Sequence, residues 1–580
     1  MPGLDMVMNI AKDALASQQY GIVVTGHNIA NVNTEGYSRQ RVVYTAKDPV
    51  NYGGILIGRG VDTSEIVRIS DQFIENQLIE KKSNMLSSRE MESYMQVLEG
   101  LFNESSGTSM STMLADFWNS WHDIANNPSG APERIALYEH SILLSGQFKA
   151  LDTDLTQLET DLTSAVSAAI VAINQITSEI AEINDQIPGM ETSNVSNDLR
   201  DKRNMLVSEL GEYLDVKTFE QNNGSLTVVT ARGCILVSGN DSYDLNLNGT
   251  AVEWESSGGT TIDITDYLTN GRLGGWLDMR DEIIAKYTLD LDAAAEEFIW
   301  AVNQQHSQGV GLELFQPSSS VTGTYQTSTT LADLNFAGQI DFTGSFTVWV
   351  GDSNGSNLAS TTINLNGNVD STSTIAQLCT FLDTELNGTG IDVAPSNNAV
   401  CFTIDGTHTL GFSDDTSNIL AALGVNTFFD GTGAGSIAVN SVINDKDYIA
   451  VARIDALGNY ASGDNTNALS IADLQYSSRS IRQYTCVRGQ TDSYENVTAT
   501  LEDYYHSMVG SIGIKSASIS RGRAFNEVMV AKLGEVRDSI SAVSLDEEMT
   551  NLIKFQQAYA AAAKLISVAD EMLTMLLSVK

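Results

Sequence analysis

The chain has 580 residues, a length that predicts about four domains at roughly 150 residues each. Its 32 Lys and Arg residues against 73 Asp and Glu residues give a formal net charge of −41, which excludes a general binder of nucleic acid or anionic lipid, because both partners are polyanions. The 42% hydrophobic content is enough to bury sizeable cores, so the chain is not a disordered acidic tail.

Residues 1–45 predict an amphipathic helix and no signal peptide. A stripe with steps of four and three is apolar at six of its eight positions, which are Leu4, Met8, Ala11, Leu15, Gln18, Ile22, Thr25 and Ile29. The first residues lack the basic start, the unbroken apolar run and the small-residue cleavage site of a secretory signal. No stretch reaches the roughly 18 apolar residues that span a bilayer, so we expect no membrane insertion.

The next segment, residues 46–215, predicts a helical domain that begins at about residue 62. Its helical pattern is broken at Asn126-Asn127-Pro128 and at Pro188-Gly189, and the second break predicts an αα-hairpin. Residues 216–270 alternate like strands between Asn-Gly turns, and residues 271–315 return to helical spacing.

An acidic β-rich segment follows at residues 316–440, with one helix expected at 372–386. No Lys or Arg lies between Lys286 and Lys446, whereas 17 Asp and Glu residues do. A uniformly anionic module between helical segments is most simply an exposed outer domain that its own charge keeps soluble. Residues 441–543 predict a helical return, with helix resuming from about residue 466.

Residues 544–580 predict a second amphipathic helix. Ser544 and Glu547 have the spacing of a capping box at its start. Eight of the ten stripe positions are apolar, and the stripe consists of Leu545, Met549, Leu552, Gln556, Tyr559, Ala563, Ile566, Asp570, Leu573 and Leu577. The fold class is therefore mainly α with β-rich inserted outer domains (α+β, multidomain), and the two terminal helices are expected to pair as a coiled coil.

Patterns that carry chemistry are weak in this sequence. Gly351-Asp-Ser353-Asn-Gly355 matches the nucleophile elbow of hydrolases, but a strand pattern follows where a helix is required, so a hairpin turn is favoured. The six histidines form no ligand pair, and Gly431 to Gly435 favours a loop over a dinucleotide site. We expect four lone thiols, with a Cys379–Cys401 bridge as an unsupported alternative. The sequence predicts no enzyme, no catalytic residue, no cofactor and no metal site.

Both ends of the chain resemble the bacterial flagellar rod, hook and hook-associated proteins. The N-terminal resemblance lies in residues 16–42, and its motif residues are Asn28, Ile29, Ala30, Asn31, Asn33, Thr34, Gly36 and Tyr37. The C-terminal resemblance lies in residues 544–577, and it includes Phe555, Gln556 and Gln557. Within this superfamily, residues 551–559, 463–475 and 423–429 look like the FlgK-type hook-associated proteins.

The resemblance implies a structural subunit at the junction between flagellar hook and filament. The terminal helices would pair into the inner tube, and the β-domains would face outward. The implied partners are further copies of the chain in a ring, the hook protein, the next hook-associated junction protein, and an export chaperone on the C-terminal helix. The resemblance also implies an extracellular location, reached through the flagellar type III apparatus, which reads an uncleaved N-terminus.

Three alternatives remain at this point. Another axial flagellar protein, a hook or distal-rod subunit, would share the termini but usually lacks the internal motif at 463–475. A secreted hydrolase would use Ser353. An adhesin would use the acidic β-rich segment, which is its sole support.

Overall fold

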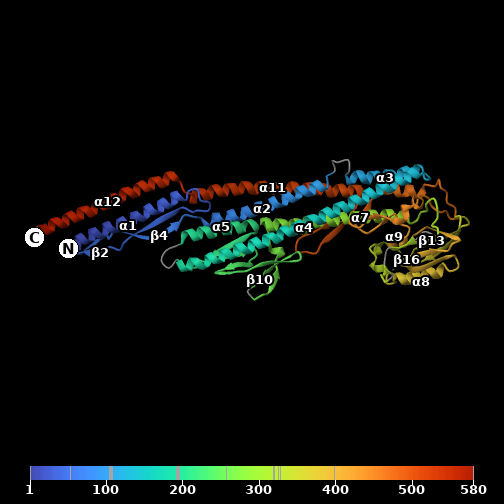
Figure 1. Ribbon diagram of the computed structural model, residues 1–580, viewed down its shortest axis with the longest axis horizontal. Coiled ribbons are helices and arrows are strands. Elements are labelled where there is room, and N and C mark those ends of the chain that lie inside the picture. Colours follow the sequence, from blue (N-terminus) through green and yellow to red (C-terminus); the bar gives the residue numbers. More distant parts are fainter. Residues whose placement is uncertain are drawn as a thin grey trace. The chain divides into compact units, whose positions relative to one another are not determined.

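The computed structural model describes residues 2–52, 54–103, 109–190, 196–256, 258–317, 321–323, 326, 328–396 and 399–578 (Figure 1). The chain forms two compact units, each built from separate stretches of sequence. Unit 1 comprises Met1–Ser93, Leu162–Met279 and Ala517–Lys580, and unit 2 comprises Tyr94–Asp161 and Arg280–Ser516.

The described helices range in length from five residues in α9 to 60 residues in α4. They are α1 (Pro2–Ala30), α2 (Gln72–Leu101), α3 (Met110–Asn126), α4 (Ala131–Met190), α5 (Asn197–Tyr213), α6 (Gly271–Asp278), α7 (Ala285–His306), α8 (Ile375–Glu385), α9 (Ile419–Leu423), α10 (Thr466–Ala472), α11 (Leu501–Ser541) and α12 (Leu545–Ser578). A π-helical turn at Met279–Ile284 joins α6 to α7.

Unit 1 contains small antiparallel sheets beside its helices. Its strands are β1 (Gln40–Ala46), β2 (Val50–Tyr52), β3 (Ile55–Ile57), β4 (Val61–Arg68), β5 (Val216–Glu220), β6 (Leu226–Thr230), β7 (Ile235–Ser238), β8 (Asp241–Ser242), β9 (Leu245–Asn248), β10 (Ala251–Glu255) and β11 (Thr261–Asp263). Strands β5 to β8 form one sheet in sequence order, β9 to β11 form another, and β1 pairs with β4.

The core of unit 1 packs α4, α5 and α6 against these sheets. Ile173 and Ile180 of α4 are fully buried with Leu210 of α5 and Val228 of β6. Residues Ala131–Pro188 of α4 are long and apolar enough for a bilayer span, with a mean hydropathy of 1.2 in an 18-residue window. A helix that packs into a protein core passes the same test of length and composition, and α4 buries Ile173 and Ile180 in this core.

Unit 2 holds the remaining strands. They are β12 (Val321–Thr322), β13 (Ser345–Asp352), β14 (Ala359–Asn364), β15 (Ile391–Ser396), β16 (Ala399–Ile404), β17 (His408–Ser413), β18 (Phe429–Asp430), β19 (Ala438–Val439), β20 (Arg479–Thr485) and β21 (Ser493–Ala499). The acidic segment forms two three-stranded sheets, β14-β13-β17 and β12-β16-β15, with α8 beside them. Its helix and strands agree with the expectation for residues 316–440.

Two stretches differ from the helical expectation. Residues 62–68 belong to β4, and residues 479–499 form the β20–β21 hairpin instead of continuing the helix of α10. Both hairpins pack on helices: β1 and β4 contact α1, and β20 contacts α7. A short strand packed on a helix shows half-buried positions that resemble helical spacing, so periodicity alone does not separate the two.

Candidate assembly interface

The two ends of the chain pack against each other in unit 1. Figure 1 shows α1 and α12 side by side, with both termini at the same end of the pair. Gly21 of α1 allows a close approach, because a Cβ there would lie 2.9 Å from Cδ1 of Phe555 on α12 and 2.8 Å from the Tyr44 hydroxyl on β1. Ala562 and Ala569 of α12 are buried, so small residues form much of this contact.

The predicted stripe of α1 lies on the buried side of that helix, whereas the predicted stripe of α12 is only partly covered in the single chain. Leu4, Leu15, Ile22, Ile29, Leu552 and Ile566 are half-buried. Four other stripe residues are exposed by 37–56%: Leu545, Met549, Tyr559 and Leu573. The buried face of α12 runs instead through Glu548, Ala562 and Ala569. The reason is that α1 divides its buried surface between α12 and the β1–β4 hairpin, which a single stripe does not describe.

A buried polar cluster ties the base of α12 to the end of α1. Asn28 Nδ2 donates to Glu548 Oε2 (3.0 Å) across 520 residues of sequence, and it also donates to the Gln40 carbonyl (2.9 Å). Arg39 Nε donates to Glu548 Oε1 (2.8 Å), and Arg39 Nη1 donates to Glu547 Oε2 (2.7 Å). We call Asn28, Tyr37, Arg39, Glu547 and Glu548 the terminal clamp.

Within the terminal clamp, the buried carboxylate of Glu548 is compensated by hydrogen-bond donors. The Glu548 side chain is only 3% exposed, so its carboxylate depends on Arg39 and Asn28 to replace water. The Tyr37 hydroxyl donates to Asn28 Oδ1 (2.7 Å). Burial raises the pKa of Tyr37, and the nearby carboxylates of Asp198, Asp201 and Glu548 raise it further, so the phenol keeps the proton that it donates.

The loop between α1 and β1 positions the clamp. Asn31 Nδ2 donates to the His27 carbonyl (3.0 Å), and Thr34 Oγ1 donates to Asn31 Oδ1 (3.1 Å). The Ser38 amide donates to Asp201 of α5 (3.1 Å), which also accepts from Arg68 (2.8 Å). The motif residues Asn28, Asn31, Thr34 and Tyr37 are thus joined by hydrogen bonds within one turn.

Gly36 gives the loop a conformation that a side chain would strain. Its φ is +77°, and a Cβ would lie 2.3 Å from Met205 Cγ on α5. We expect Gly36→Ala to reduce the stability of the α1 end by about 1–2 kcal/mol. Gly26→Ala, inside α1 with nothing within 4 Å of the added methyl, should instead stabilise it by about 0.5–1 kcal/mol. Hydrogen exchange of the α1 amides in both variants measures the difference, and equal shifts would contradict it.

The C-terminal motif has one half-buried member. Phe555 packs against Gly21, whereas Gln556 and Gln557 are exposed. The capping box predicted at Ser544 differs in the structure, where the carboxylate of Glu547 pairs with Arg39 at 2.7 Å. The guanidinium is already held by Glu548, so a second carboxylate on the same turn of α12 is within its reach.

The internal motifs lie in unit 2 and bond its backbone together. Asn467 Nδ2 donates to the Ala450 carbonyl (2.8 Å), and Asn426 Nδ2 donates to the carbonyls of Ser307 and Gly309 (3.0 Å each). Phe428 and Phe429 pack into a buried aromatic cluster with Phe117, Trp121 and Phe298. Sequence reasoning identified these segments by resemblance but not their role, because the carbonyls that they bind are distant in sequence.

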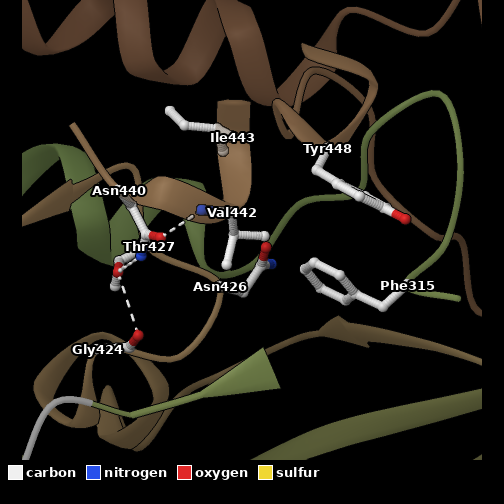
Figure 2. A pocket seen from close by; sticks show the side chains of 8 residues that line it. All are labelled: Phe315, Gly424, Asn426, Thr427, Asn440, Val442, Ile443 and Tyr448. Atoms are coloured by element: carbon white, nitrogen blue, oxygen red, sulfur yellow. Dashed lines mark hydrogen bonds between the residues drawn. The ribbon is translucent and has the colours of Figure 1, made fainter. Parts of the chain in front are cut away.

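A small cavity in unit 2 lies beside the second motif. Figure 2 shows its lining residues, which are Phe315, Gly424, Asn426, Thr427, Asn440, Val442, Ile443 and Tyr448. Its volume of about 10 Å³ is close to the minimum that holds one water molecule. This cavity is therefore a packing feature and not a ligand site.

The segment that matches a hydrolase elbow is a hairpin turn. β13 and β14 pair in antiparallel register on either side of it, and Asp352 Oδ1 accepts from the amides of Asn354 and Ser356. All four cysteines are free thiols, so there is no Cys379–Cys401 bridge. Among the described residues, no group of three His, Cys, Asp or Glu side chains is arranged to hold a metal ion.

Comparison with known proteins identifies two matching family models. The FlgK helical domain of flagellar hook-associated proteins matches residues 95–316, and the C-terminal model of the flagellar basal body rod proteins FlgEFG matches residues 538–579. The second match covers the whole of α12, including its clamp residues Glu547 and Glu548.

Full-length relatives and a solved structure agree with these matches. Flagellar hook-associated protein 1 of Escherichia coli K12 is 27% identical over the whole of both chains, and that of Bacillus subtilis 168 is 24% identical over 98% of this chain and 97% of its own. The flagellar hook junction protein FlgK of Burkholderia pseudomallei has a similar fold, with a TM-score of 0.51 and 17% identity over 80% of this chain and all of that one. Over its whole length the chain is therefore similar to the FlgK-type flagellar hook-associated proteins.

Proposed function

We propose that the chain is a structural subunit of the bacterial flagellum that forms the junction between hook and filament. The observation that carries this proposal is the pairing of α1 with α12, held by the terminal clamp across 520 residues of sequence. A subunit built this way presents both ends of its chain as one rod, which suits stacking with copies of itself. The family is structural, and the chain is not an enzyme.

The exposed stripe residues of α12 support assembly with neighbouring subunits. Leu545, Met549, Tyr559 and Leu573 leave apolar surface in water that their own chain does not cover. In a ring of copies, this surface would pack against the terminal helices of the next subunit. The hook protein and the next hook-associated junction protein would cover the two ends of that ring.

The distribution of charge also favours association at the termini. Half of the 32 Lys and Arg residues lie in residues 1–93 and 517–580, which are about a quarter of the chain. Basic and acidic residues nearly balance there, so copies can approach without the repulsion that a net charge of −41 would otherwise cause. The acidic segment at 316–440 would then face outward.

We further propose export through the flagellar type III apparatus to an extracellular position. The motif in residues 16–42, which resembles the N-terminal motif of the flagellar axial proteins, supports this route. Before export, a chaperone would cover the exposed apolar side chains of α12, because such a surface is prone to aggregation in the cell.

Substitution on the exposed stripe separates assembly from folding. Met549 is 56% exposed, so we expect Met549→Asp to change the free energy of unfolding by no more than about 0.5 kcal/mol while it abolishes attachment to the hook. Lys554→Asp, also exposed on α12 but outside the stripe, is the matched control and should leave attachment intact. Secreted and hook-attached protein are measured separately, so a chaperone or export defect is distinguished from an assembly defect.

Immunogold labelling of isolated flagella tests the location directly. Label at the boundary between hook and filament is the expected result. Label along the hook or the rod would favour another axial protein, and label confined to the cell surface would favour an adhesin. Normal filaments with the Met549→Asp variant would show that this stripe is not an assembly surface.

A further inference from the structure

Helix α11 carries an exposed stripe that its own chain leaves uncovered. Its members are Arg521, Phe525, Val528 and Lys532, spaced by four, three and four residues along one face. Phe525 is 64% exposed and Val528 is 68% exposed. The side of α11 that packs on α2 is a different one, because Arg523 pairs with Glu92 of α2 and Gly522 lies against Ser88.

The charge of this stripe is unusual for the chain. Arg521 donates through Nε to the Ala517 carbonyl (3.0 Å), which leaves its charge without a carboxylate, whereas Lys532 pairs with Glu535. An apolar centre flanked by two cations is typical of a contact surface, where the apolar part is buried and the charges select the partner.

The β9–β11 sheet offers the opposite charge. Glu253 of β10 and Asp263 of β11 are direct cross-strand partners, and Glu255 lies two residues along β10 on the same face. No Lys or Arg occurs between Arg232 and Arg272. Within the sheet, Glu253 accepts a hydrogen bond from the side-chain amide of Asn248, and Glu255 accepts one from that of Asn246. Like charges directly opposite each other destabilise a strand pair unless a cation compensates them.

We propose that the α11 stripe of one copy docks on the β9–β11 face of the neighbouring copy in the ring. This inference rests on the proposed function, because it assumes side-by-side copies. Within unit 1, Figure 1 places the C-terminal half of α11 along one edge and β10 at the opposite edge. Two different faces on opposite edges make a heterologous contact, which forms a ring when the repeated rotation closes. A two-fold contact of the stripe with itself would place Arg521 against Lys532, one cation against another.

Disulfide capture tests the contact in assembled flagella. We expect a chain with Val528→Cys and Thr261→Cys to form covalent oligomers on oxidation, because both positions are exposed and would face each other across the interface. Either substitution alone, with the four native cysteines, should give monomer. Glu527→Cys combined with Thr261→Cys is the matched control, because residue 527 lies on an adjacent face of α11 and should not cross-link.

Charge exchange tests the same contact independently. Arg521→Glu with Lys532→Glu should remove the oligomers, and adding Glu253→Lys with Asp263→Lys to the same chain should restore them. Suppose that immunogold label on the wild type lies at the junction but the Val528→Cys, Thr261→Cys chain forms no oligomers. That result would overturn the contact and leave the proposed function standing. Cross-linking of Val528→Cys alone to the hook protein would also overturn it. Absence of wild-type label from the junction would instead be a failure of the proposed function.

Discussion

Replacing Arg39 with methionine is expected to weaken the docking of α12 by about 3 kcal/mol, the largest effect that we expect from a single substitution in unit 1. The Glu548 carboxylate is 3% exposed, and without the guanidinium it would remain buried with Asn28 as its main donor. Breaking a buried ion pair from one side is costly because the other charge stays desolvated. Hydrogen exchange of the α12 amides measures the free energy of its opening.

Two further variants show how much of the loss comes from burying the Glu548 charge without a partner. Arg39→Met combined with Glu548→Gln should recover part of the loss, because no charge is then buried without a partner. Arg537→Met removes an exposed pair with Asp538 and should cost less than about 0.5 kcal/mol. If Arg39→Met and Arg537→Met had the same effect on α12, the clamp would have no special role in holding the termini together. Arg39→Met should also reduce attachment to the hook, because α1 and α12 would no longer present one surface.

Acidification is expected to destabilise unit 2 by about 3 kcal/mol through His306 between pH 6.5 and pH 4. Burial lowers the pKa of this fully buried imidazole from 6.5 to about 4. Its Nε2 accepts from the Ala450 amide (3.0 Å), and its Nδ1 bonds to the Asn426 carbonyl (2.9 Å), so the neutral ring satisfies both neighbours. Protonation would place a hydrogen on Nε2 against the Ala450 amide.

The direction of this pH effect on stability follows from how many protons His306 binds in the folded and in the unfolded chain. Between pH 6.5 and pH 4, the unfolded chain takes up a proton at this histidine and the folded chain does not, so the unfolded state gains stability as the pH falls. Above pH 6.5 neither state is protonated, and His306 adds no pH dependence. Denaturant unfolding at several pH values measures the slope.

His306→Gln isolates this contribution from the acidic groups. Burial raises the pKa of Asp415 and of Asp430, but both residues are present in the wild type and in the variant, so their effects cancel in the difference of slopes. We therefore expect a shallower acid slope for His306→Gln than for the wild type. Equal slopes for wild type and His306→Gln would mean that the ring is charged in the fold or is not buried.

Much of the local structure could be predicted because its cause is local. The apolar spacing of residues 4–29 and 545–577 predicted helices, which are α1 and α12. Asn-Gly turns between alternating residues predicted the strands of 216–270, and the pattern after Gly355 favoured a hairpin over a catalytic elbow, as β13 and β14 confirm. The motifs at both ends and at 463–475 were enough for the family, because each is a run of consecutive residues.

The contacts between distant residues depended on tertiary structure. Which face of α12 is buried follows from Gly21, whose missing side chain admits Phe555, and from Arg39, whose charge draws Glu548 inward. Periodicity states that a helix has an apolar side but not which neighbour covers it, because several faces of one helix can be buried by different elements. The sequence by itself determined the two terminal helices, the hairpin turns and the resemblance to the FlgK-type proteins. The tertiary structure decided the terminal clamp and the exposed stripes, because a buried charge is stable only beside a partner, and here that partner is 509 residues away.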